Sequence, residues 1–547
     1  MTPSVLLLAL NARYSHSNPT LFQLKGILER EKIPCCLEEL TIKESIPALL
    51  DAVLTRKTKP THLLMSVYIW NSTLTASFLT DLQQLAPEIT LILGGPEVGY
   101  NQDHWQKICP NAYLVRGPGE DVILPLVQGK IEEKLVTAPP MEMSDVPFPY
   151  SQEDLKLLEN RLVYYETSRG CPFKCSYCLS SCEDQPLAHH DLDRALEELK
   201  VLAFSGARTI KLVDRSFNCR PKRARKIWSA LLEWNGPVCF HFEIHPLFLE
   251  EEDFLLLAQV PTHLFHFEIG VQTVIEEELK LINRKGSWED IRDKIARLIK
   301  ETEIPIHLDQ IVGLPGSDKE SVIHSFNSIL SLRPEEFQMG FLKILPGTPL
   351  AAGEGKKMRP SSLPPYQVWE TPWLSYEEIR YFNRIEEWLG AYYNSERFTH
   401  TMALVLGEDS PYGKEPFLFF EKMEHFSPHK GRVKSQQWAF LGELLWNCLS
   451  GDFPQWKPAL KDALRRDWAP LSQGQYLPGF LQFEDPKLIK ELRREFWPLC
   501  EKEGINLSDY KKSLLIILEG SKEVEISIPG KSERKVYRFH TGDRKKN

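Results

Sequence analysis

Short apolar runs alternate with amphipathic segments along the first 140 residues. Runs of mainly apolar residues predict strands at residues 4–10, 35–40, 62–68, 90–97 and 112–120. Segments between them predict helices at residues 21–31, 46–55 and 75–85. Because strands and helices alternate in this order, we expect an α/β domain built on a doubly wound parallel sheet.

The loops that follow these strands are rich in glycine and small polar residues: NARYSHSNPT, SVYIWNST, GGPEVG and RGPGE. Rossmann-like sheets bind ligands beyond the carboxyl ends of their strands, and glycines let a flat, bulky ligand come close. GxGxxG is absent after the first strand, which argues against a dinucleotide. A domain that binds nothing, or a nucleotide, remains the alternative. The residues expected to contact a ligand are Tyr14, Ser15, Ser66, Tyr68, Asn71, Gly94, Gly95, Glu97, Gly117, Gly119 and Glu120.

A second series of strand-like runs occupies residues 162–167, 209–213, 238–244, 264–271, 306–312 and 337–345. Helical or loop segments separate the runs, so the pattern predicts a central partial (β/α)6 barrel of parallel strands. Ser317 and Glu320 match a capping box, which predicts the start of a helix there.

Polar residues and glycines gather where these strands end, which is where barrels carry their chemistry. Asp214 follows one strand, Glu268 and Gln272 interrupt an apolar run, and Gly313 and Gly316 belong to a GLPG loop. Each of these features has an alternative explanation. Asp214 could form an internal ion pair with Arg215, and Glu268 and Gln272 could hydrogen-bond the barrel backbone. GLPG could be a plain turn before a helix.

Proline-rich breaks divide the chain. Residues 141–150 contain DVPFPY, and residues 353–365 follow the barrel. Beyond them, apolar residues at three-to-four spacing predict amphipathic helices, and residues 523–540 predict a terminal hairpin around Pro529-Gly530. We therefore expect a ligand-binding α/β domain at 1–140, a linker at 141–160, the barrel at 161–352 and a mainly helical extension at 353–547.

Composition agrees with a globular protein of three or four domains: 547 residues, 42% hydrophobic and 26% charged. No apolar run approaches the roughly 18–20 residues of a membrane helix. VLLLAL lacks the flanks of a signal peptide, so it is expected to be the first strand. The net charge of -9 argues against a general nucleic-acid binder. The eleven cysteines lie mostly singly, which predicts a reducing, cytoplasmic setting and no disulfide framework.

One group of cysteines is an exception. SRGCPFKCSYCLSSC brings Cys171, Cys175, Cys178 and Cys182 within twelve residues. Soft thiolates select zinc, copper(I) or an iron–sulfur cluster, and three ligands leave one metal corner open. A zinc knuckle completed by Cys182 or by a distant histidine is the alternative.

The CxxxCxxC spacing after a strand, with Tyr177 before its last cysteine, resembles the radical S-adenosylmethionine (SAM) enzymes. This resemblance implies that Cys171, Cys175 and Cys178 hold a [4Fe–4S] cluster, whose fourth iron is chelated by SAM. In that family, one electron cleaves SAM to methionine and a 5′-deoxyadenosyl radical.

With the N-terminal domain included, the order of motifs resembles the cobalamin-dependent group of these enzymes. The resemblance implies cobalamin in the N-terminal domain, SAM near Asp214, Glu268 and Gln272, and its adenine near residues 311–316, which include Gly313 and Gly316. The DxHxxG motif of an axial histidine is absent, so no histidine ligand is expected. The nearby histidines His16, His62 and His104 lack its pattern.

The implied reaction is methylation of an unactivated carbon by way of methylcobalamin. The alternatives are a cobalamin-assisted cyclisation or rearrangement, and a non-catalytic iron–sulfur redox or sensing module. The expected partners are a small-molecule or peptide substrate and a reductant such as flavodoxin or ferredoxin, with no membrane or nucleic acid. We further expect residues 366–393 to pack against the barrel and cobalamin domain, the alternative being an appended stabilising or recruiting domain. No catalytic residue is assigned.

Overall fold

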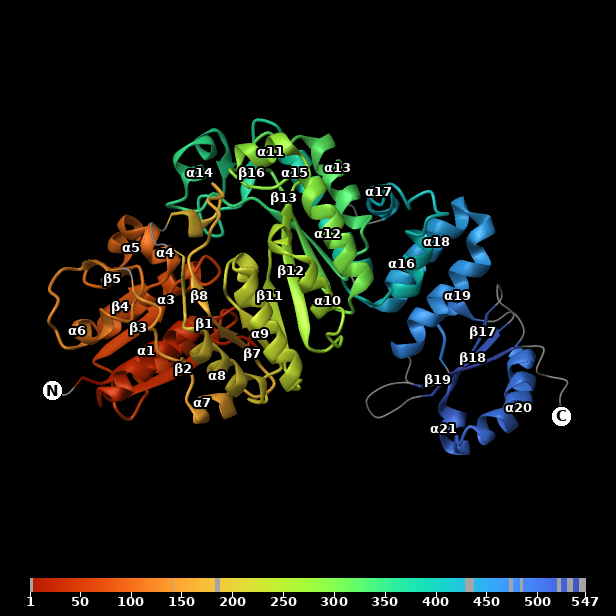
Figure 1. The fold of residues 1–547 in the computed structure, drawn as a ribbon, viewed down its shortest axis with the longest axis horizontal. Coiled ribbons are helices and arrows are strands. Elements are labelled where there is room, and N and C mark those ends of the chain that lie inside the picture. The colour runs from red at the N-terminus through yellow and green to blue at the C-terminus, as the bar shows by residue number, and fades with distance from the viewer. Residues whose placement is uncertain are drawn as a thin grey trace. The chain divides into compact units, whose positions relative to one another are not determined.

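The structure is a computed structural model that describes residues 3–139, 141–182, 187–427, 437–471, 476–482, 486–518, 523–528 and 535–540. Its contacts divide the chain into two compact units (Figure 1). The first comprises residues 1–325 and 332–379, and the second residues 326–331 and 380–547. No described helix is both long enough and apolar enough to cross a membrane.

The first unit opens with a six-stranded parallel sheet in the order β2-β1-β3-β4-β5-β6 (Figure 1, red to orange). Because β1 lies between β2 and β3, the strand order reverses there, and this point is where doubly wound sheets bind ligands. The predicted α/β fold is confirmed. The elements are β1 (Val5–Asn11), α1 (Pro19–Arg30), β2 (Cys35–Thr41), α2 (Ile46–Leu54), β3 (His62–Ser66), α3 (Ser72–Leu85), β4 (Thr90–Gly94), α4 (Pro96–Tyr100), α5 (Gln102–Ile108), β5 (Tyr113–Arg116), α6 (Ile123–Val127) and β6 (Leu135–Thr137).

Both faces of this sheet are buried, which explains the continuous apolar run of β1. Leu6 and Leu8 belong to a core formed with α2, α3 and α5, whereas Val5 and Leu7 belong to a core formed with α1 and α6. Helices on both faces leave only the strand ends open, so the ligand site must lie at an end of the strands.

A second parallel sheet follows in the order β7-β10-β11-β12-β13-β14 (Figure 1, yellow to green). Its outermost strands, β7 and β14, each pair with one strand of this sheet, which agrees with the predicted partial barrel. Its elements are α7 (Gln152–Leu157), β7 (Leu162–Tyr165), β8 (Ser168–Arg169), β9 (Ala188–His189), α8 (Leu192–Ala203), β10 (Thr209–Leu212), α9 (Pro221–Trp234), β11 (Cys239–Glu243), α10 (Glu251–Leu257), β12 (Phe265–Gln272), α11 (Glu276–Leu281), α12 (Trp288–Glu301), β13 (Ile306–Val312), α13 (Lys319–Leu330), β14 (Glu336–Phe341) and α14 (Pro349–Ala352).

Strand β12 shows how the barrel separates apolar from polar side chains. Phe265 and Phe267 are fully buried, and the Phe267 ring lies 5.6 Å from the ring of Trp228 on α9. The alternate residues His266 and Glu268 are only partly buried and lie on the opposite face. The helices therefore cover an apolar face, and the other face of the sheet is polar.

One local prediction is wrong. Asp318, and not Ser317, caps α13, because Asp318 Oδ1 accepts a 2.9 Å hydrogen bond from the backbone N–H of Ser321. Ser317 belongs instead to the preceding turn, where its N–H donates to the carbonyl of Leu314.

Most of the remaining elements belong to the second unit, which also includes residues 326–331 at the end of α13. Glu523–Ile528 and Lys535–His540 pair antiparallel as predicted, and β17 extends this hairpin to three strands; the turn at Pro529-Gly530 lies outside the described residues. A core of this unit joins Leu492 and Phe496 to Val524 and Ile526. The elements are β15 (Arg359–Pro360), β16 (Val368–Glu370), α15 (Tyr376–Tyr392), α16 (Thr399–Val405), α17 (Phe417–Phe426), α18 (Trp438–Asp452), α19 (Lys457–Trp468), α20 (Pro486–Lys502), α21 (Leu507–Lys512), β17 (Leu514–Leu518), β18 (Glu523–Ile528) and β19 (Lys535–His540).

Candidate cofactor site

A cavity of about 910 Å³ lies at the carboxyl ends of β1, β3, β4 and β5. This volume is at the upper end of the range for small-molecule sites. Its wall continues onto the barrel, through residues next to the cysteine loop. Of the residues predicted from the sequence, those that line it are Ser66, Tyr68, Gly94, Gly95, Gly117, Gly119 and Glu120.

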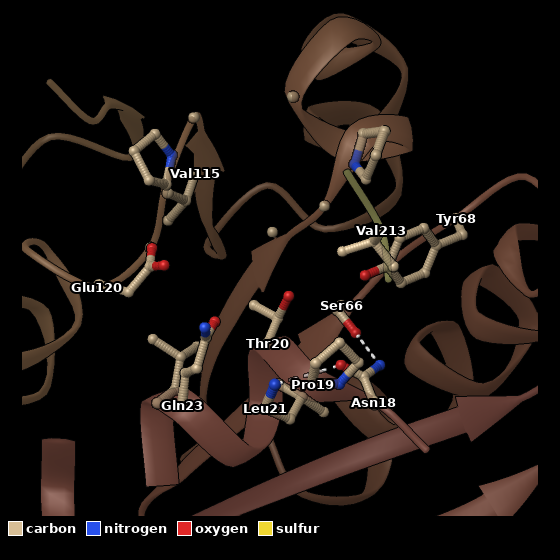
Figure 2. Close-up of a pocket in the computed structure, with 18 of the residues that line it drawn as sticks. Asn18, Pro19, Thr20, Leu21, Gln23, Ser66, Tyr68, Val115, Glu120 and Val213 are labelled. Atoms are coloured by element: carbon tan, nitrogen blue, oxygen red, sulfur yellow. Dashed lines mark hydrogen bonds between the residues drawn. The ribbon is translucent and has the colours of Figure 1, made fainter. Parts of the chain in front are cut away.

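The start of α1 forms one side of this cavity (Figure 2). Asn18 caps the helix by accepting a hydrogen bond from Leu21 N, and its Nδ2 donates to Ser66 Oγ at 2.7 Å. This bond holds the loop after β1 against the end of β3. Figure 2 shows Thr20, Gln23 and Glu120 around the same space. Asn18, Thr20 and Gln23 were not predicted as ligand contacts, although an asparagine before Pro-Thr is a helix-start signal.

Glycines line the opposite side because a side chain would not fit there. Gly95 has φ +95°, and a Cβ on it would lie 2.5 Å from the carbonyl oxygen of Val67. Gly117 has φ +92°, and a Cβ on it would lie 3.1 Å from the carbonyl oxygen of Ala138. Glycine is therefore required at both positions, by the positive φ and by the closeness of the neighbouring backbone.

The other predicted contacts support the cavity without lining it. Asn71 is buried, and its Nδ2 donates to the carbonyls of Leu10 and Ser66. Glu97 accepts a 2.5 Å hydrogen bond from the hydroxyl of Tyr366. Residue Tyr366, from the segment after the barrel, thus contacts the N-terminal domain within the first unit.

Tyr14 and Ser15 lie at the junction with the barrel. The Tyr14 side chain is 78% exposed, and the guanidinium of Arg161 lies 5.4 Å from its ring centroid. The carbonyl of Ser15 accepts from the N–H of Leu162, which starts β7. Their predicted contact with cobalamin remains a prediction.

Of the three nearby histidines, His16 lines the cavity. Its Nδ1 lies 2.9 Å from the hydroxyl of Tyr164 on β7, and burial lowers its pKa. His62 lies at the amino end of β3, away from the cavity, and His104 lies on α5. His16 is therefore the one of these three histidines that a ligand in the cavity could reach, and the expectation that no histidine binds cobalt must be tested there.

The sequence did not predict which barrel residues line the cavity. It includes Tyr164, Glu166, Arg169, Leu179, Val213 and Arg215. The guanidinium of Arg169 pairs with Glu120 at 2.5 Å and with Glu166 at 2.6 Å. Glu120 comes from the loop after β5, so this contact joins two segments that the sequence pattern cannot place together.

The cysteine loop follows β8 directly. Its backbone is held by Ser176 N, which donates to the carbonyl of Ile282, and by Asn283 Nδ2, which donates to the carbonyl of Lys174. The guanidinium of Arg284 lies 3.7 Å from Cys175 Sγ. Burial, as the largest cause, raises the pKa of Cys171, whose Sγ lies 4.0 Å from Ser216 Oγ.

The three thiols fit a cluster better than a single zinc ion. A tetrahedral zinc holds its thiolates about 3.8 Å apart, given Zn–S bonds of about 2.3 Å. In the part of the chain that the structure describes, Cys171, Cys175 and Cys178 do not form a group whose sulfurs all lie within 4.8 Å of one another. An iron–sulfur cluster is larger than one ion, so its cysteine ligands lie farther apart than those of zinc. A cationic neighbour such as Arg284 also suits its thiolate ligands.

Asp214, which follows β10, is fully buried beside the residues that lead into this loop. Its carboxylate accepts from the backbone N–H of Thr167 at 2.8 Å, from Thr167 Oγ1 at 2.6 Å and from Ser168 Oγ at 2.6 Å. Burial raises its pKa, and these hydrogen bonds oppose that rise. Asp214 thus positions the turn that leads into the cysteine loop.

Glu268 lies on the polar face of the barrel. Lys211 Nζ and His241 Nε2 each lie 2.8 Å from its Oε2. Burial on its own would raise the pKa of Glu268, but the hydrogen bond from His241 and the charge and hydrogen bond of Lys211 lower it well below its usual range. Glu268 is therefore ionised and held in place.

Gln272 ends β12 at a bulge, with φ +74°. Its Oε1 is buried and makes no hydrogen bond within the described chain. A buried acceptor without a partner is costly, and it marks Gln272 as a residue that can receive a ligand's N–H or O–H.

The GLPG loop follows β13 at the same end of the barrel. Gly313 and Gly316 have φ +91° and +85°, so both need the left-handed conformation that glycine adopts without strain. A Cβ on Gly316 would lie 2.8 Å from Leu281 Cδ1. The positive φ angles and this packing explain why the loop needs glycine. The predicted contact of the loop with the adenine of SAM remains a prediction.

Comparison with known families identifies the central part of the chain. Residues 165–329 match the Radical SAM superfamily. Residues 357–521 match a family described as a protein of unknown function (DUF4080).

Two curated relatives are similar over about half of the chain. The tRNA-2-methylthio-N(6)-dimethylallyladenosine synthase of Acinetobacter baumannii (strain AYE) is 23% identical over 293 residues, 49% of this chain and 59% of that protein. The cobalamin-dependent radical SAM methyltransferase TokK of Streptomyces tokunonensis is 23% identical over 332 residues, 54% of this chain and 49% of that protein. The chain thus spans three fifths or less of the length of these relatives.

Two solved structures share the fold. The radical SAM methyltransferase TsrM from Kitasatospora setae, with tryptophan substrate and a SAM analogue bound, is 19% identical with a TM-score of 0.54, covering 65% of this chain and 77% of that one. The cobalamin-dependent SAM radical enzyme OxsB, with aqua-cobalamin bound, is 13% identical with a TM-score of 0.57, covering 85% and 80%.

Residues 165–329 are therefore a radical SAM domain. The match to a radical SAM domain and the multidomain fold shared with these two solved structures agree with the expected resemblance to cobalamin-dependent radical SAM enzymes and confirm the expected fold class. The structures of TsrM and OxsB hold cobalamin, with a [4Fe–4S] cluster in TsrM, which agrees with the cofactor set expected here of [4Fe–4S] cluster, SAM and cobalamin; the contacting residues remain predictions.

Proposed function

We propose that this chain is an enzyme that uses cobalamin and SAM to methylate an unactivated carbon of a small molecule or peptide. One observation carries the proposal. A single cavity joins the carboxyl ends of β1, β3, β4 and β5 to residues of the cysteine loop and its neighbours. A ligand bound at the switch point of the sheet would thus lie beside the metal-binding loop.

In this proposal Cys171, Cys175 and Cys178 hold the cluster, and Gln272 contacts SAM. Cobalamin lies against the glycine backbone at Gly95 and Gly117. When bound, the reduced cluster and SAM would supply a carbon-centred radical, and cobalamin would supply the methyl group.

The chain's own residues position and shield these groups. Arg284 places a positive charge 3.7 Å from Cys175 Sγ and stabilises thiolate ligands. Asp214 fixes the turn before the loop through three hydrogen bonds. The unpartnered Oε1 of Gln272 would accept a hydrogen bond from SAM. Tyr68 and Trp70 stack at 4.3 Å and line the cavity, so they would exclude water from one side of a bound corrin.

The choice of methylation is supported by the names of two similar proteins, TokK and TsrM, which are methyltransferases. Other similar proteins are named as tRNA-modifying synthases. The net charge of -9 disfavours a polyanionic substrate, so we favour a small molecule or peptide. A reductant such as flavodoxin or ferredoxin would donate the electron.

Anaerobic reconstitution with iron, sulfide, cobalamin, SAM and a reductant tests this function. Mass spectrometry should detect 5′-deoxyadenosine together with a product heavier by one CH2 unit, because a methyl group replaces a hydrogen. Cleavage of SAM without any methylated product from candidate substrates would favour the cyclisation or rearrangement alternative. Cluster binding with no SAM cleavage would favour a redox or sensing module.

A further inference from the structure

Three metal-ligating side chains lie together at the opposite end of the barrel strands. His266 is the second residue of β12, His307 is the second residue of β13, and Glu336 is the first residue of β14. The parallel register pairs His307 directly with Glu336. One ligand atom from each of the three residues lies within 4.8 Å of the other two.

The hydrogen bonding of these residues is incomplete. His266 Nε2 is buried and has no hydrogen-bond partner among the described residues. Nδ1 of His307 lies 3.7 Å from Glu336 Oε2, which is too long for a hydrogen bond. The ring's other nitrogen, Nε2, lies 3.1 Å from Asp309 Oδ1, but neither atom makes a hydrogen bond within the described chain. Buried imidazole nitrogens are costly without a partner, and a cation between these groups would provide one.

We infer that His266, His307 and Glu336 bind one divalent transition-metal ion, of which zinc is the best match. Two imidazoles and one carboxylate are a ligand set that zinc uses, with bonds of about 2.0–2.2 Å. Asp309 Oδ1 lies 3.1 Å from His307 Nε2, close enough to orient the ring when a metal binds, as a carboxylate commonly does for a metal-binding histidine. The Glu336 side chain is 46% exposed, so an ion can enter from solvent.

This site is separate from the proposed cofactor cavity, because none of its three residues lines that cavity. It is also distant from Gln272, the proposed SAM contact. Gln272 lies six residues beyond His266 on β12, which places the two about 20 Å apart at 3.3 Å per residue. The metal would tie β14, which pairs only with β13 in the described sheet, to β12 and β13. We assign it a stabilising role at the open edge of the partial barrel.

Cobalt(II) is a suitable probe because its visible absorption reports coordination by nitrogen and oxygen. The full chain carrying Cys171→Ala, Cys175→Ala and Cys178→Ala is treated with a chelator and titrated with Co²⁺, so that the loop thiols cannot take the metal. We expect one Co²⁺ per chain, displaced by Zn²⁺. His307→Ala and Glu336→Gln should each weaken binding about tenfold or more, and Asp309→Asn about 10–100-fold.

His263→Ala is the matched control, because His263 is exposed and lies just before β12; it should bind Co²⁺ like its parent. His266→Gln replaces a partly exposed ligand and serves if His307→Ala does not fold. Zinc content of the cluster-loaded wild-type chain gives an independent measurement, with one zinc per chain expected. Absence of bound Co²⁺ and zinc, or binding that is unchanged in His266→Gln and Glu336→Gln, would overturn the inference.

Discussion

Arg169 and Glu120 form an ion pair of 2.5 Å that joins the cysteine loop to the N-terminal sheet. Arg169 precedes Cys171 by two residues, and Glu120 lies in the loop after β5 with its side chain only 2% exposed. Both residues line the cavity. The position of the metal-binding loop is therefore coupled to the loop proposed to contact cobalamin.

Replacing Arg169 by alanine should destabilise the first unit. The change leaves the buried carboxylate of Glu120 without its cation, and such a loss costs about 3 kcal/mol. The midpoint of urea unfolding of the cofactor-free chain measures this effect. Arg169→Ala/Glu120→Gln should be more stable than Arg169→Ala, because the buried charge is removed as well. Equal stability of Arg169→Ala and wild type would contradict the coupling.

Gly95→Ala should weaken cobalamin binding strongly. Its new Cβ would lie 2.5 Å from the carbonyl of Val67, in a conformation that alanine adopts at a cost of about 1–3 kcal/mol. Gly26→Ala is the control, because Gly26 on α1 does not line the cavity and a Cβ there would meet no atom within 4 Å. Cobalamin titration followed by visible absorption compares them. Equal affinity of the two variants would argue against a ligand at this glycine backbone.

Much of the sheet side of this cavity could be predicted from the sequence. Strand ends in a doubly wound sheet converge, so Gly94, Gly95 and Glu120 followed from periodicity and glycine content alone. Tyr164, Arg169 and Arg215 could not be predicted to face them, because docking of two α/β segments leaves no periodic signal. The hydrogen bonds of Asp214 were equally hidden, since they depend on a turn whose residues lie 46 and 47 positions earlier.

Cys171, Cys175 and Cys178 should be required for the iron, whereas Cys182 should not. Cys182 Sγ donates to the carbonyl of Gly347 at 3.0 Å, so it has a structural contact of its own. Iron and sulfide analysis after anaerobic reconstitution should show loss of the cluster in the triple Cys→Ala variant and full loading in Cys182→Ala. If Cys182→Ala alone empties the site, the ligand assignment is wrong.

Cobalamin should bind without a protein histidine on cobalt. The expectation rests on the sequence, which lacks the DxHxxG motif of an axial histidine. His16 is the histidine to test, because it lines the cavity with its Nδ1 2.9 Å from the Tyr164 hydroxyl. EPR of the cob(II)alamin form should therefore be the same in wild type and His16→Ala. Nitrogen superhyperfine splitting that disappears in His16→Ala, but persists in His62→Ala, would show the opposite.

We expect cobalamin to bind in the cavity beside the cysteine loop. A variant in which a large side chain fills part of this cavity is the sharpest test. Thr20 faces this space in Figure 2, whereas Arg30 is exposed at the other end of the same helix, α1. Titration of the full chain with hydroxocobalamin, followed by visible absorption, should give one cobalamin per chain for wild type and Arg30→Trp. Thr20→Trp should bind at least about tenfold more weakly, because an indole would fill the site. No cobalamin bound by wild type, or equal binding by Thr20→Trp, would contradict the account.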